Sequence, residues 1–239
     1  MEVLEVLQKC TVKENTVTLP DIQLDRKTYL AAAQKLELIG GKWNRKAKGF
    51  IFEQDPAELL ADIQNGGNRN LKKEFQFFET PEELADKLCS YLPKSDISEI
   101  LEPSAGRGSI VRAVNKCRGD VPVYYCELME LNRKMFNGKA TFICDDFLNL
   151  PNENKFDVVI ANPPFSKNQD IEHFYKMVNV CKRRVISIMS THWMYCNGKK
   201  ETSFKEFLAR HKHQIIELDS GAFKESGTLV KSCIVILDK

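Results

Sequence analysis

Two patterns of hydrophobic and polar positions follow one another along the chain, and the polar, glycine-containing residues 64–70 separate them. In the first part, short β-like and helical runs alternate, and glycine or proline marks their ends. They predict a strand at residues 16–19, a helix from Asp25 that Gly40-Gly41 stops, a strand at residues 49–52 and a short helix that Pro56 opens. We therefore expect a small α+β unit over residues 1–66 and a linker over residues 67–77.

The second part begins with a helix start at Thr80-Pro81-Glu82-Glu83. Thr80 is predicted to be the N-cap, Pro81 to occupy the first helical position, and Glu83 to complete a capping box. Seven β-like runs follow, and helical runs alternate with most of them. The β-like runs are residues 97–101, 121–126, 140–144, 156–161, 185–189, 214–218 and 232–237.

This alternation is typical of an α/β protein with helices on both faces of a parallel sheet. The last two strands are joined by the turn-like residues 221–227, which suits an antiparallel pair at the sheet edge. The prediction for residues 78–239 is a Rossmann-like, doubly wound, mostly parallel sheet of seven strands with an antiparallel edge strand.

The composition supports a globular chain, since 43% of the 239 residues are hydrophobic and 28% are charged. No apolar run approaches the ~18–20 residues that cross a bilayer, so we expect no membrane partner. The chain starts with Glu2 and Glu5, unlike a signal or transit peptide, which predicts a cytoplasmic location.

The net charge of +2 is too small to indicate nucleic acid by itself, but two basic runs stand out. Lys42, Arg45, Lys46 and Lys48 lie within seven residues without an acid, and Lys182-Arg183-Arg184 forms the second run. Such runs are usually solvated faces, and a contact with phosphate is the alternative.

The cysteines and histidines do not indicate a metal site. None of the eight cysteines forms a C-x-x-C pair and several lie in apolar runs, which favours buried free thiols. The four histidines form no metal motif and are predicted to lie on the surface.

A loop of small residues directly follows the first strand of the second part: Glu102-Pro103-Ser104-Ala105-Gly106-Arg107-Gly108. Ligands of doubly wound sheets bind at the carboxyl ends of the strands. Gly106 and Gly108 permit tight turning, and small side chains at Ser104 and Ala105 let a bulky cofactor approach the backbone.

The next strand ends at Glu127, 21 residues after Gly106. A carboxylate at that distance can accept hydrogen bonds from both ribose hydroxyls of an adenosine. This fits NAD as well as S-adenosylmethionine, but a dinucleotide fingerprint has a third small residue where Val111 stands. The loop predicts a nucleoside cofactor, and a plain strand-to-helix turn is the alternative.

The apolar strand at residues 156–161 runs into Asn162-Pro163-Pro164-Phe165. Two consecutive prolines stiffen the backbone and remove two donors, and Pro163 restricts Asn162 to an extended conformation. The result is a rigid rim that presents the Asn162 side-chain oxygen and the Pro163 carbonyl, with Phe165 as a flat face. A merely proline-stiffened strand end is the alternative.

That rim suits an aromatic amine, whose nitrogen is a poor nucleophile because its lone pair is delocalised into the ring. Two acceptors that hold the amino hydrogens localise this lone pair, so that the nitrogen can attack a sulfonium methyl in line. Stacking on Phe165 holds the base with ~1–3 kcal/mol. Positioning and electrostatics would carry the rate without a general base.

With both loops in view, residues 75–239 resemble the amino-methyltransferases, most closely the adenine-N6 DNA methyltransferases with the gamma-type motif order. The resemblance implies an S-adenosylmethionine-dependent, site-specific DNA-methyltransferase. In that family a Phe-x-Thr-Pro segment, here Phe78 to Pro81, helps to hold the methionine end of the cofactor. Glu127 falls on the ribose-binding acid, and Asp146-Phe147 matches the pair that contacts the cofactor adenine, with Asp145 as a one-residue alternative.

The predicted catalytic residues are Asn162, Pro163, Pro164 and Phe165. The predicted cofactor site consists of Thr80, Pro81, Glu102, Ser104, Ala105, Gly106, Gly108, Glu127, Leu128, Asp146, Phe147 and Asn162. The resemblance further assigns the lining of the base pocket to Gly221-Ala222-Phe223, Gly227-Thr228 and residues 234–237.

One departure from the family concerns target recognition. Only 74 residues follow Phe165, too few for the sheet and a target-recognition domain, so specificity would come from residues 1–66 or from a partner. Residues 40–46 resemble a small module often fused to mobile-element proteins. Trp43 with its basic neighbours is our candidate DNA contact, and Trp43 packed in a small core is the alternative. Restriction-modification and mobile elements are the expected contexts.

If duplex DNA is the substrate, the adenine must leave the stack to reach Phe165, and phosphate contacts are needed. The candidates are residues 42–48, Arg133-Lys134, Lys167 and Lys199-Lys200. Two further functions stay open. One is amino-methyl transfer to ribosomal RNA or a protein glutamine, and the other is a non-catalytic nucleic-acid-binding module with a relic site.

Overall fold

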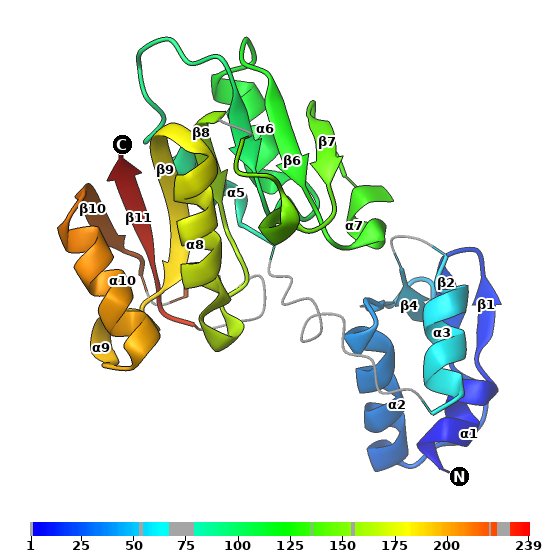
Figure 1. The fold of residues 1–239 in the computed structure, drawn as a ribbon. Helices are drawn as coiled ribbons and strands as arrows, with labels where there is room; N and C mark the ends of the chain where they lie inside the picture. Colours follow the sequence, from blue (N-terminus) through cyan, green and yellow to red (C-terminus); the bar gives the residue numbers. More distant parts are fainter. Residues whose placement is uncertain are drawn as a thin grey trace. The chain divides into compact units, whose positions relative to one another are not determined.

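The computed structural model describes residues 2–52, 55–66, 79–134, 136–153, 156–219, 221–223 and 230–239 (Figure 1). By its internal contacts the chain divides into two compact units, Met1–Phe77 and Phe78–Lys239. The predicted linker at residues 67–77 lies outside the described ranges. Among the helices that are described, none combines the length and the hydropathy needed to cross a bilayer.

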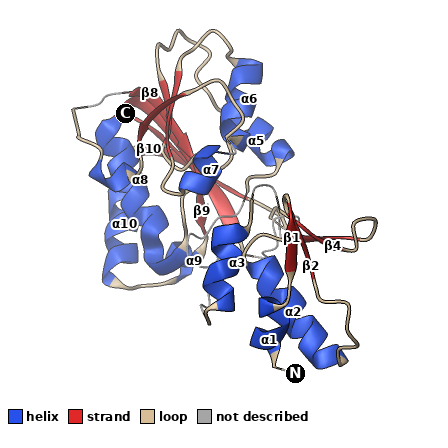
Figure 2. Ribbon diagram, turned by 90° about the vertical axis from the view of Figure 1, so that its right-hand side faces the viewer, coloured by secondary structure: helices blue, strands red, loops and turns tan. Residues whose placement is uncertain are grey.

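The small unit packs helices on one side of an antiparallel sheet with the strand order β1-β2-β4-β3 (Figure 2). Its core joins Val17 and Phe50 of the sheet to Leu7, Leu36 and Leu60 of the helices. Its elements are α1 (Val3–Gln8), β1 (Thr11–Lys13), β2 (Thr16–Thr18), α2 (Arg26–Leu38), β3 (Lys42–Asn44), β4 (Gly49–Ile51) and α3 (Ala57–Gln64).

The predicted elements of the small unit are confirmed within one or two residues. The Asp25 carboxylate caps α2 by accepting a hydrogen bond from the Thr28 amide at 3.0 Å. The helix ends before Gly40, whose φ of +101° is the left-handed conformation that favours glycine. The sequence pattern did not predict α1, β1 or β3, because elements this short carry too few apolar positions to show a period.

The large unit is built on a seven-stranded sheet with the order β10-β11-β9-β8-β5-β6-β7. Its strands are β5 (Ile100–Glu102), β6 (Val123–Cys126), β7 (Thr141–Cys144), β8 (Phe156–Ala161), β9 (Cys181–Ser190), β10 (Lys212–Glu217) and β11 (Ser232–Asp238). Its helices and 3-10 turns are α5 (Glu82–Cys89), α6 (Ser109–Cys117), α7 (Glu130–Lys134), η1 (Phe147–Asn149), η2 (Ser166–Asn168), α8 (Gln169–Val180), α9 (His192–Tyr195) and α10 (Lys199–Ala209).

The Rossmann-like, mostly parallel sheet is confirmed. β5, β6, β7, β8 and β9 pair in parallel, and β11 pairs antiparallel with both β9 and β10. The reversed strand β11 therefore lies beside the edge strand β10 and ties it to the rest of the sheet.

Helices cover both faces of the sheet (Figure 1). Successive side chains of β8 point to opposite faces and belong to two different cores. Val158 and Ile160 belong to the core under α5 and α6. Val159 and Ala161 belong to the core under α8 and α10. Every residue of β8 is buried, Asp157 included, as is typical of a central parallel strand covered on both faces.

Two predictions about single residues are wrong. Thr80 does not cap a helix, because α5 begins at Glu82 with Pro81 at the N-cap position, and the Thr80 hydroxyl instead accepts a hydrogen bond from Asn162. His173 is not on the surface: α8 buries it to 8% exposure, with Nδ1 against the Gln169 carbonyl at 2.9 Å. This burial lowers the pKa of His173.

Candidate functional site

The predicted loops meet at one edge of the large sheet. β5 lies between β6 and β8, and all three run in the same direction. Their carboxyl ends are Glu102, Cys126 and Ala161, so the loops that follow them lie side by side.

The loop after β5 is closed by backbone contacts with the end of β6. The Ala105 amide donates to the Cys126 carbonyl at 3.0 Å, and the Gly106 amide donates to Glu127 Oε2 at 2.7 Å. Gly106 and Gly108 have φ values of +55° and +86°. A side chain at Gly108 would also lie 2.9 Å from the Phe136 ring, so this turn requires glycine for its conformation and for its space.

Glu127 is buried to 8% exposure and is already engaged by the protein. Besides Gly106, its carboxylate accepts from the Met129 amide at 2.8 Å and from Asn132 Nδ2 at 3.2 Å. A carboxylate offers about four acceptor positions, so one remains for a ribose hydroxyl. Asn132 is 1% exposed. The sequence did not predict its contact with Glu127, because an asparagine inside a short helical run has no distinguishing pattern.

Glu102 is the second carboxyl group at this edge, and its surroundings are different. It is 1% exposed, and its Oε2 atom is buried without a hydrogen-bond partner. Burial raises the pKa of Glu102 to about 8, and the neighbouring Glu127 adds to the shift. A buried acid with an unsatisfied oxygen fits a ligand that brings a cationic group to it.

Asn162 directly follows β8 and is held by a residue far away in the sequence. Its Nδ2 atom donates to Thr80 Oγ1 at 3.1 Å. The neighbouring Glu79 accepts a hydrogen bond from Ser109 Oγ at 3.2 Å, and Arg112 lies 3.8 Å from the Glu79 carboxylate. Residues 79–80 therefore join the first turn of α6 to the loop after β8, and the sequence pattern did not point to Glu79, Ser109 or Arg112.

The rest of the Asn-Pro-Pro-Phe segment forms one wall of the same edge. Pro163 is buried, and Pro164 and Phe165 are half-buried. The ring of Phe165 meets the ring of Phe223 edge-on, with 6.5 Å between the centroids. Phe223, which the family resemblance placed near the base pocket, thus adjoins the predicted catalytic segment; Phe78 and Gly227-Thr228 lie outside the described residues.

The residues predicted to contact the cofactor adenine have local partners. Both oxygens of Asp146 accept hydrogen bonds from the η1 turn, namely from the Leu148 amide at 3.0 Å and from Asn149 at 2.9 Å. Asp145 pairs with Arg133. Phe147 is packed in the core, whereas Leu128 is 59% exposed next to Glu127. Their roles at the cofactor stay predictions.

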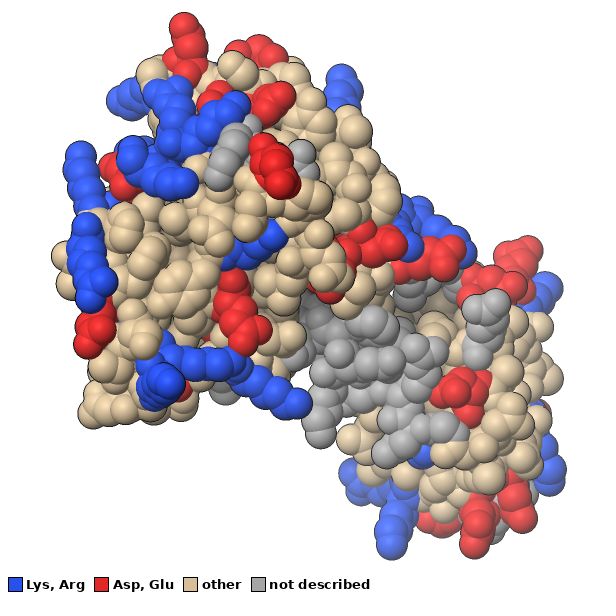
Figure 3. Space-filling model, viewed as in Figure 1, with Lys and Arg blue, Asp and Glu red and all other residues tan. Residues whose placement is uncertain are grey.

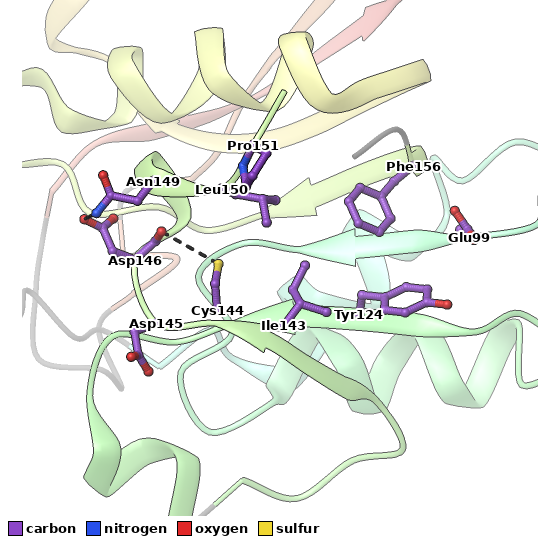
Figure 4. Close-up of a pocket in the computed structure, with 10 residues that line it drawn as sticks. All are labelled: Glu99, Tyr124, Ile143, Cys144, Asp145, Asp146, Asn149, Leu150, Pro151 and Phe156. Carbon is purple, nitrogen blue, oxygen red and sulfur yellow. Dashed lines mark hydrogen bonds between the residues drawn. The ribbon is translucent and has the colours of Figure 1, made fainter. Parts of the chain in front are cut away.

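A hollow of about 650 Å³ lies beside this edge, along β6 and β7 (Figure 4). Between β7 and β8 the described residues form only η1, so this flank of the sheet has no covering helix there. Asp146 and Cys144 line one end, and Glu99 and Phe156, from the opposite strand ends, line the other. The hollow therefore adjoins the predicted site without being centred on it.

The two basic runs of the sequence differ in position. Lys182-Arg183-Arg184 lies at the amino end of β9, opposite to the predicted site. Positive side chains gather in this region near the C-terminus, with acids among them (Figure 3). Arg184 pairs with Asp238 at 2.6 Å, and Arg183 donates to Ser95 at 2.7 Å. These cations stabilise the large unit and do not face the predicted site.

Of the other candidate phosphate contacts, some are paired with acidic side chains, whereas Lys167 is exposed. Arg133 pairs with Asp145, and Lys200 lies 2.5 Å from Glu172. Lys167 is exposed two residues after Phe165, and its φ is +56°. Among the candidate phosphate contacts, Lys167 thus adjoins the predicted catalytic segment in sequence, and its role stays a prediction.

The structure records all eight cysteines as free thiols, and within the described ranges no group of three or more His, Cys, Asp or Glu side chains could hold a metal ion. Cys126 and Cys144 face each other across β6 and β7 with 3.0 Å between their sulfur atoms.

The fold and the edge loops define a Rossmann-like domain of the kind that binds a nucleoside cofactor. Comparison with family models and with curated proteins finds no match. Solved structures share the fold. The "modification subunit of a putative type I restriction enzyme" from Vibrio vulnificus superposes with a TM-score of 0.57 at 14% identity, over 91% of this chain and 59% of that one.

Two further solved structures share the fold. A "putative RNA methyltransferase" from Pyrococcus horikoshii has a TM-score of 0.52 at 16% identity, over 69% of this chain and 87% of that one. The plantazolicin methyltransferase BpumL, in complex with SAH, has a TM-score of 0.50 at 13% identity, over 77% of this chain and 93% of that one. At these identities the likeness shows the fold, and the chain spans 59% of the length of the Vibrio subunit.

Proposed function

We propose that the protein transfers a methyl group from S-adenosylmethionine to the N6 amino group of adenine in DNA. The observation that carries the proposal is the position of Asn162 and Phe165. They lie at the carboxyl end of the central strand β8, beside the glycine loop of β5. Proteins with this fold are described as methyltransferases, and one of them was solved with SAH.

The residues at the edge fit this cofactor. S-adenosylmethionine supplies an electrophilic methyl group on a sulfonium. Glu102 offers an unsatisfied, buried carboxyl oxygen to a cationic group of the cofactor, and Glu127 keeps an acceptor position for a ribose hydroxyl. Gly106 and Gly108 keep side chains away from the loop. The role of Thr80-Pro81 at the methionine end follows from the family resemblance.

The substrate amine is activated by positioning. The Asn162 side-chain nitrogen donates to Thr80, and in this proposal the Asn162 amide oxygen is the acceptor that binds an amino hydrogen of the substrate. The Pro163 carbonyl is the second acceptor. When both amino hydrogens are held by acceptors, the lone pair of the amino nitrogen is localised. Phe165 stacks against the adenine ring that carries this amino group.

The test is methyl transfer from tritiated S-adenosylmethionine to DNA, RNA and protein offered in parallel. We expect label in DNA as N6-methyladenine. Asn162→Ala is expected to retain cofactor binding by calorimetry and to lose transfer by about 100-fold or more, as for the loss of an electrostatic acceptor. Equal product from wild type and Asn162→Ala would contradict the mechanism and would favour a module with a relic site.

RNA is the second candidate substrate, because the Pyrococcus structure is described as an RNA methyltransferase. DNA is preferred on the family resemblance of the loop Glu102–Gly106 and of Thr80-Pro81, and because the Vibrio subunit, described as part of a restriction enzyme, matches 91% of the chain. Label in RNA or in a protein glutamine, with none in DNA, would replace the DNA assignment.

A further inference from the structure

We propose that the open face of the small sheet, formed by β1, β2, β4 and β3, binds the sugar-phosphate backbone of DNA. The choice of DNA as the polyanion rests on the proposed function. The position of the surface rests on the register of the sheet and on the charges of its residues.

The register separates the two faces of this sheet. Val17 and Trp43 both lie opposite Phe50 on neighbouring strands, so the three side chains share one face. Val17 and Phe50 are at most 1% exposed in the core with the helices. That face belongs to α1, α2 and α3, which lie together on one side of the strands (Figure 2).

The opposite face therefore carries the residues that alternate with them. One row across the strands reads Lys13, Thr16, Ile51 and Lys42, with a lysine at each end. A second row contains Thr11 and Thr18, whose hydroxyl oxygens are 2.5 Å apart, followed by the Gly49–Asn44 pair. This open face is made mostly of hydroxyl groups and lysines.

The β3–β4 hairpin adds three cations at the end of this face. Asn44 Oδ1 accepts hydrogen bonds from the amides of Lys46 and Ala47 at 2.9 and 3.0 Å, which fixes the turn. Lys48 has a φ of +49°, and Arg45, Lys46 and Lys48 are exposed. The sequence has no acid between Glu37 and Glu53, and among the described residues Glu14 lies beside Lys13 in the β1–β2 turn.

Hydroxyls and cations in this arrangement match a phosphate backbone. Most contacts of proteins with DNA phosphates come from Lys and Arg together with Ser, Thr and Asn, and they position the duplex without reading its sequence. Trp43 is not part of this surface, because it lies on the helix face, 48% exposed, with its ring 5.2 Å from Phe50. The sequence-based hypothesis that Trp43 with its basic neighbours contacts DNA stays a prediction, and the present proposal concerns the lysines and threonines of the opposite face.

The test compares two triple variants of the full chain that lose the same charge. Arg45→Gln, Lys46→Gln and Lys48→Gln neutralise the hairpin. Lys9→Gln, Arg26→Gln and Lys27→Gln neutralise exposed cations outside the sheet and serve as the matched control. Fluorescence anisotropy gives the Kd for a labelled DNA duplex and for an RNA duplex over a range of salt concentrations, and thermal unfolding checks that both variants are folded.

We expect the slope of log K against log salt with DNA to fall by about 2–3 in the hairpin variant, at ~0.9 for each lost phosphate contact, and to stay unchanged in the control. An unchanged slope in the hairpin variant, an equal change in the control, or a change seen with RNA alone would overturn the proposal. Methyl transfer by the wild type, measured separately, distinguishes the two hypotheses: methylated DNA with an unchanged slope refutes only this surface, and a reduced slope without methylated DNA refutes only the proposed activity.

Discussion

Glu102 and Glu127 are two buried carboxyl groups at one edge of the sheet with opposite surroundings. Glu127 accepts three hydrogen bonds, two of them from backbone amides. Glu102 keeps one oxygen without a partner, and burial raises its pKa to about 8. In the free protein near neutral pH, Glu102 therefore holds a proton that the same residue loses in an unfolded chain, where the ordinary pKa is 4.5.

The raised pKa of Glu102 predicts a pH-dependent affinity for the cofactor. The cationic ligand favours the ionised form, so binding below pH 8 must release the Glu102 proton, and affinity rises with pH until about 8 and then levels off. Calorimetry in buffers of different ionisation enthalpy measures the released proton. Glu102→Gln is expected to bind more weakly and with no proton release, and a proton release that persists in this variant would exclude Glu102 as its source.

The same shift makes a prediction for stability without cofactor. Because the folded pKa is raised, the folded state binds more protons than the unfolded state between pH 4.5 and 8, so the free energy of unfolding falls as pH rises through this window. Urea unfolding at a series of pH values measures it. Glu102→Gln serves as the reference without a titrating group. If the free energy of unfolding of the wild type rose with pH relative to that of Glu102→Gln, the raised pKa of Glu102 would be contradicted.

Thr80 is expected to act as a positioning residue through Asn162. Thr80→Val removes the acceptor of the Asn162 amide and should lower kcat for methyl transfer about fivefold, since one lost hydrogen bond is worth ~1 kcal/mol. Thr80→Ser keeps the hydroxyl and should restore the rate. If Thr80→Val raised the KM for the cofactor and left kcat unchanged, Thr80 would serve the cofactor alone, as the family resemblance implies.

At the scale of elements, the turn between β5 and α6 decides how closely a ligand can approach the sheet. The α6 helix begins at Ser109, directly after Gly108 in the left-handed region. Buried apolar side chains of α6, among them Ile110, Val111 and Val114, hold it against the sheet. The loop is therefore fixed at both ends, by the core below it and by Glu127 beside it.

Gly108→Ala is expected to disturb this element. An L-residue at φ +86° is strained by ~1–2 kcal/mol, and the added methyl group would lie 2.9 Å from Phe136 and 3.0 Å from the Asn137 carbonyl. Urea unfolding should show a loss of stability, and calorimetry a weaker cofactor affinity. Gly40→Ala is the matched control, because Gly40 has a φ of +101° and no atom within 4 Å of the added carbon. Equal cofactor affinity in the two variants would contradict a role for the Gly108 turn in the site.

At the scale of the molecule, the chain consists of two compact units, each with its own apolar core. The predicted cofactor and catalytic residues with described positions all belong to the unit Phe78–Lys239. The open basic sheet face belongs to the unit Met1–Phe77. The chemistry and the proposed backbone contact are thus assigned to different units.

This division predicts two thermal transitions that respond differently to the cofactor. A ligand that binds only the folded state raises stability by ~2.7 kcal/mol at 100 times its Kd. Differential scanning calorimetry with S-adenosylmethionine should therefore move one transition to higher temperature and leave the other in place. Glu127→Ala should abolish most of this shift. A shift of both transitions by the same amount would show that the two units unfold together.

The sequence alone determined the class of the large unit and the order of its chemical segments. Alternating β-like and helical runs specify a doubly wound sheet, and glycine and proline residues mark loops whatever lies around them, because these preferences are local to the backbone. The sequence also predicted that Glu102, Glu127 and Asn162 lie at the carboxyl ends of strands, which the structure gives as β5, β6 and β8.

Only the tertiary structure decided the properties that depend on residues far apart in the chain. Thr80 does not cap α5 as predicted; its hydroxyl accepts a hydrogen bond from Asn162, 82 residues away in the sequence. The pKa of Glu102 depends on its complete burial, and β11 reaches its place between β9 and β10 through long-range pairing. Trp43 and Lys42 are neighbours in sequence, yet the pleat of β3 puts them on opposite faces, because side chains alternate along a strand and the core takes only one set.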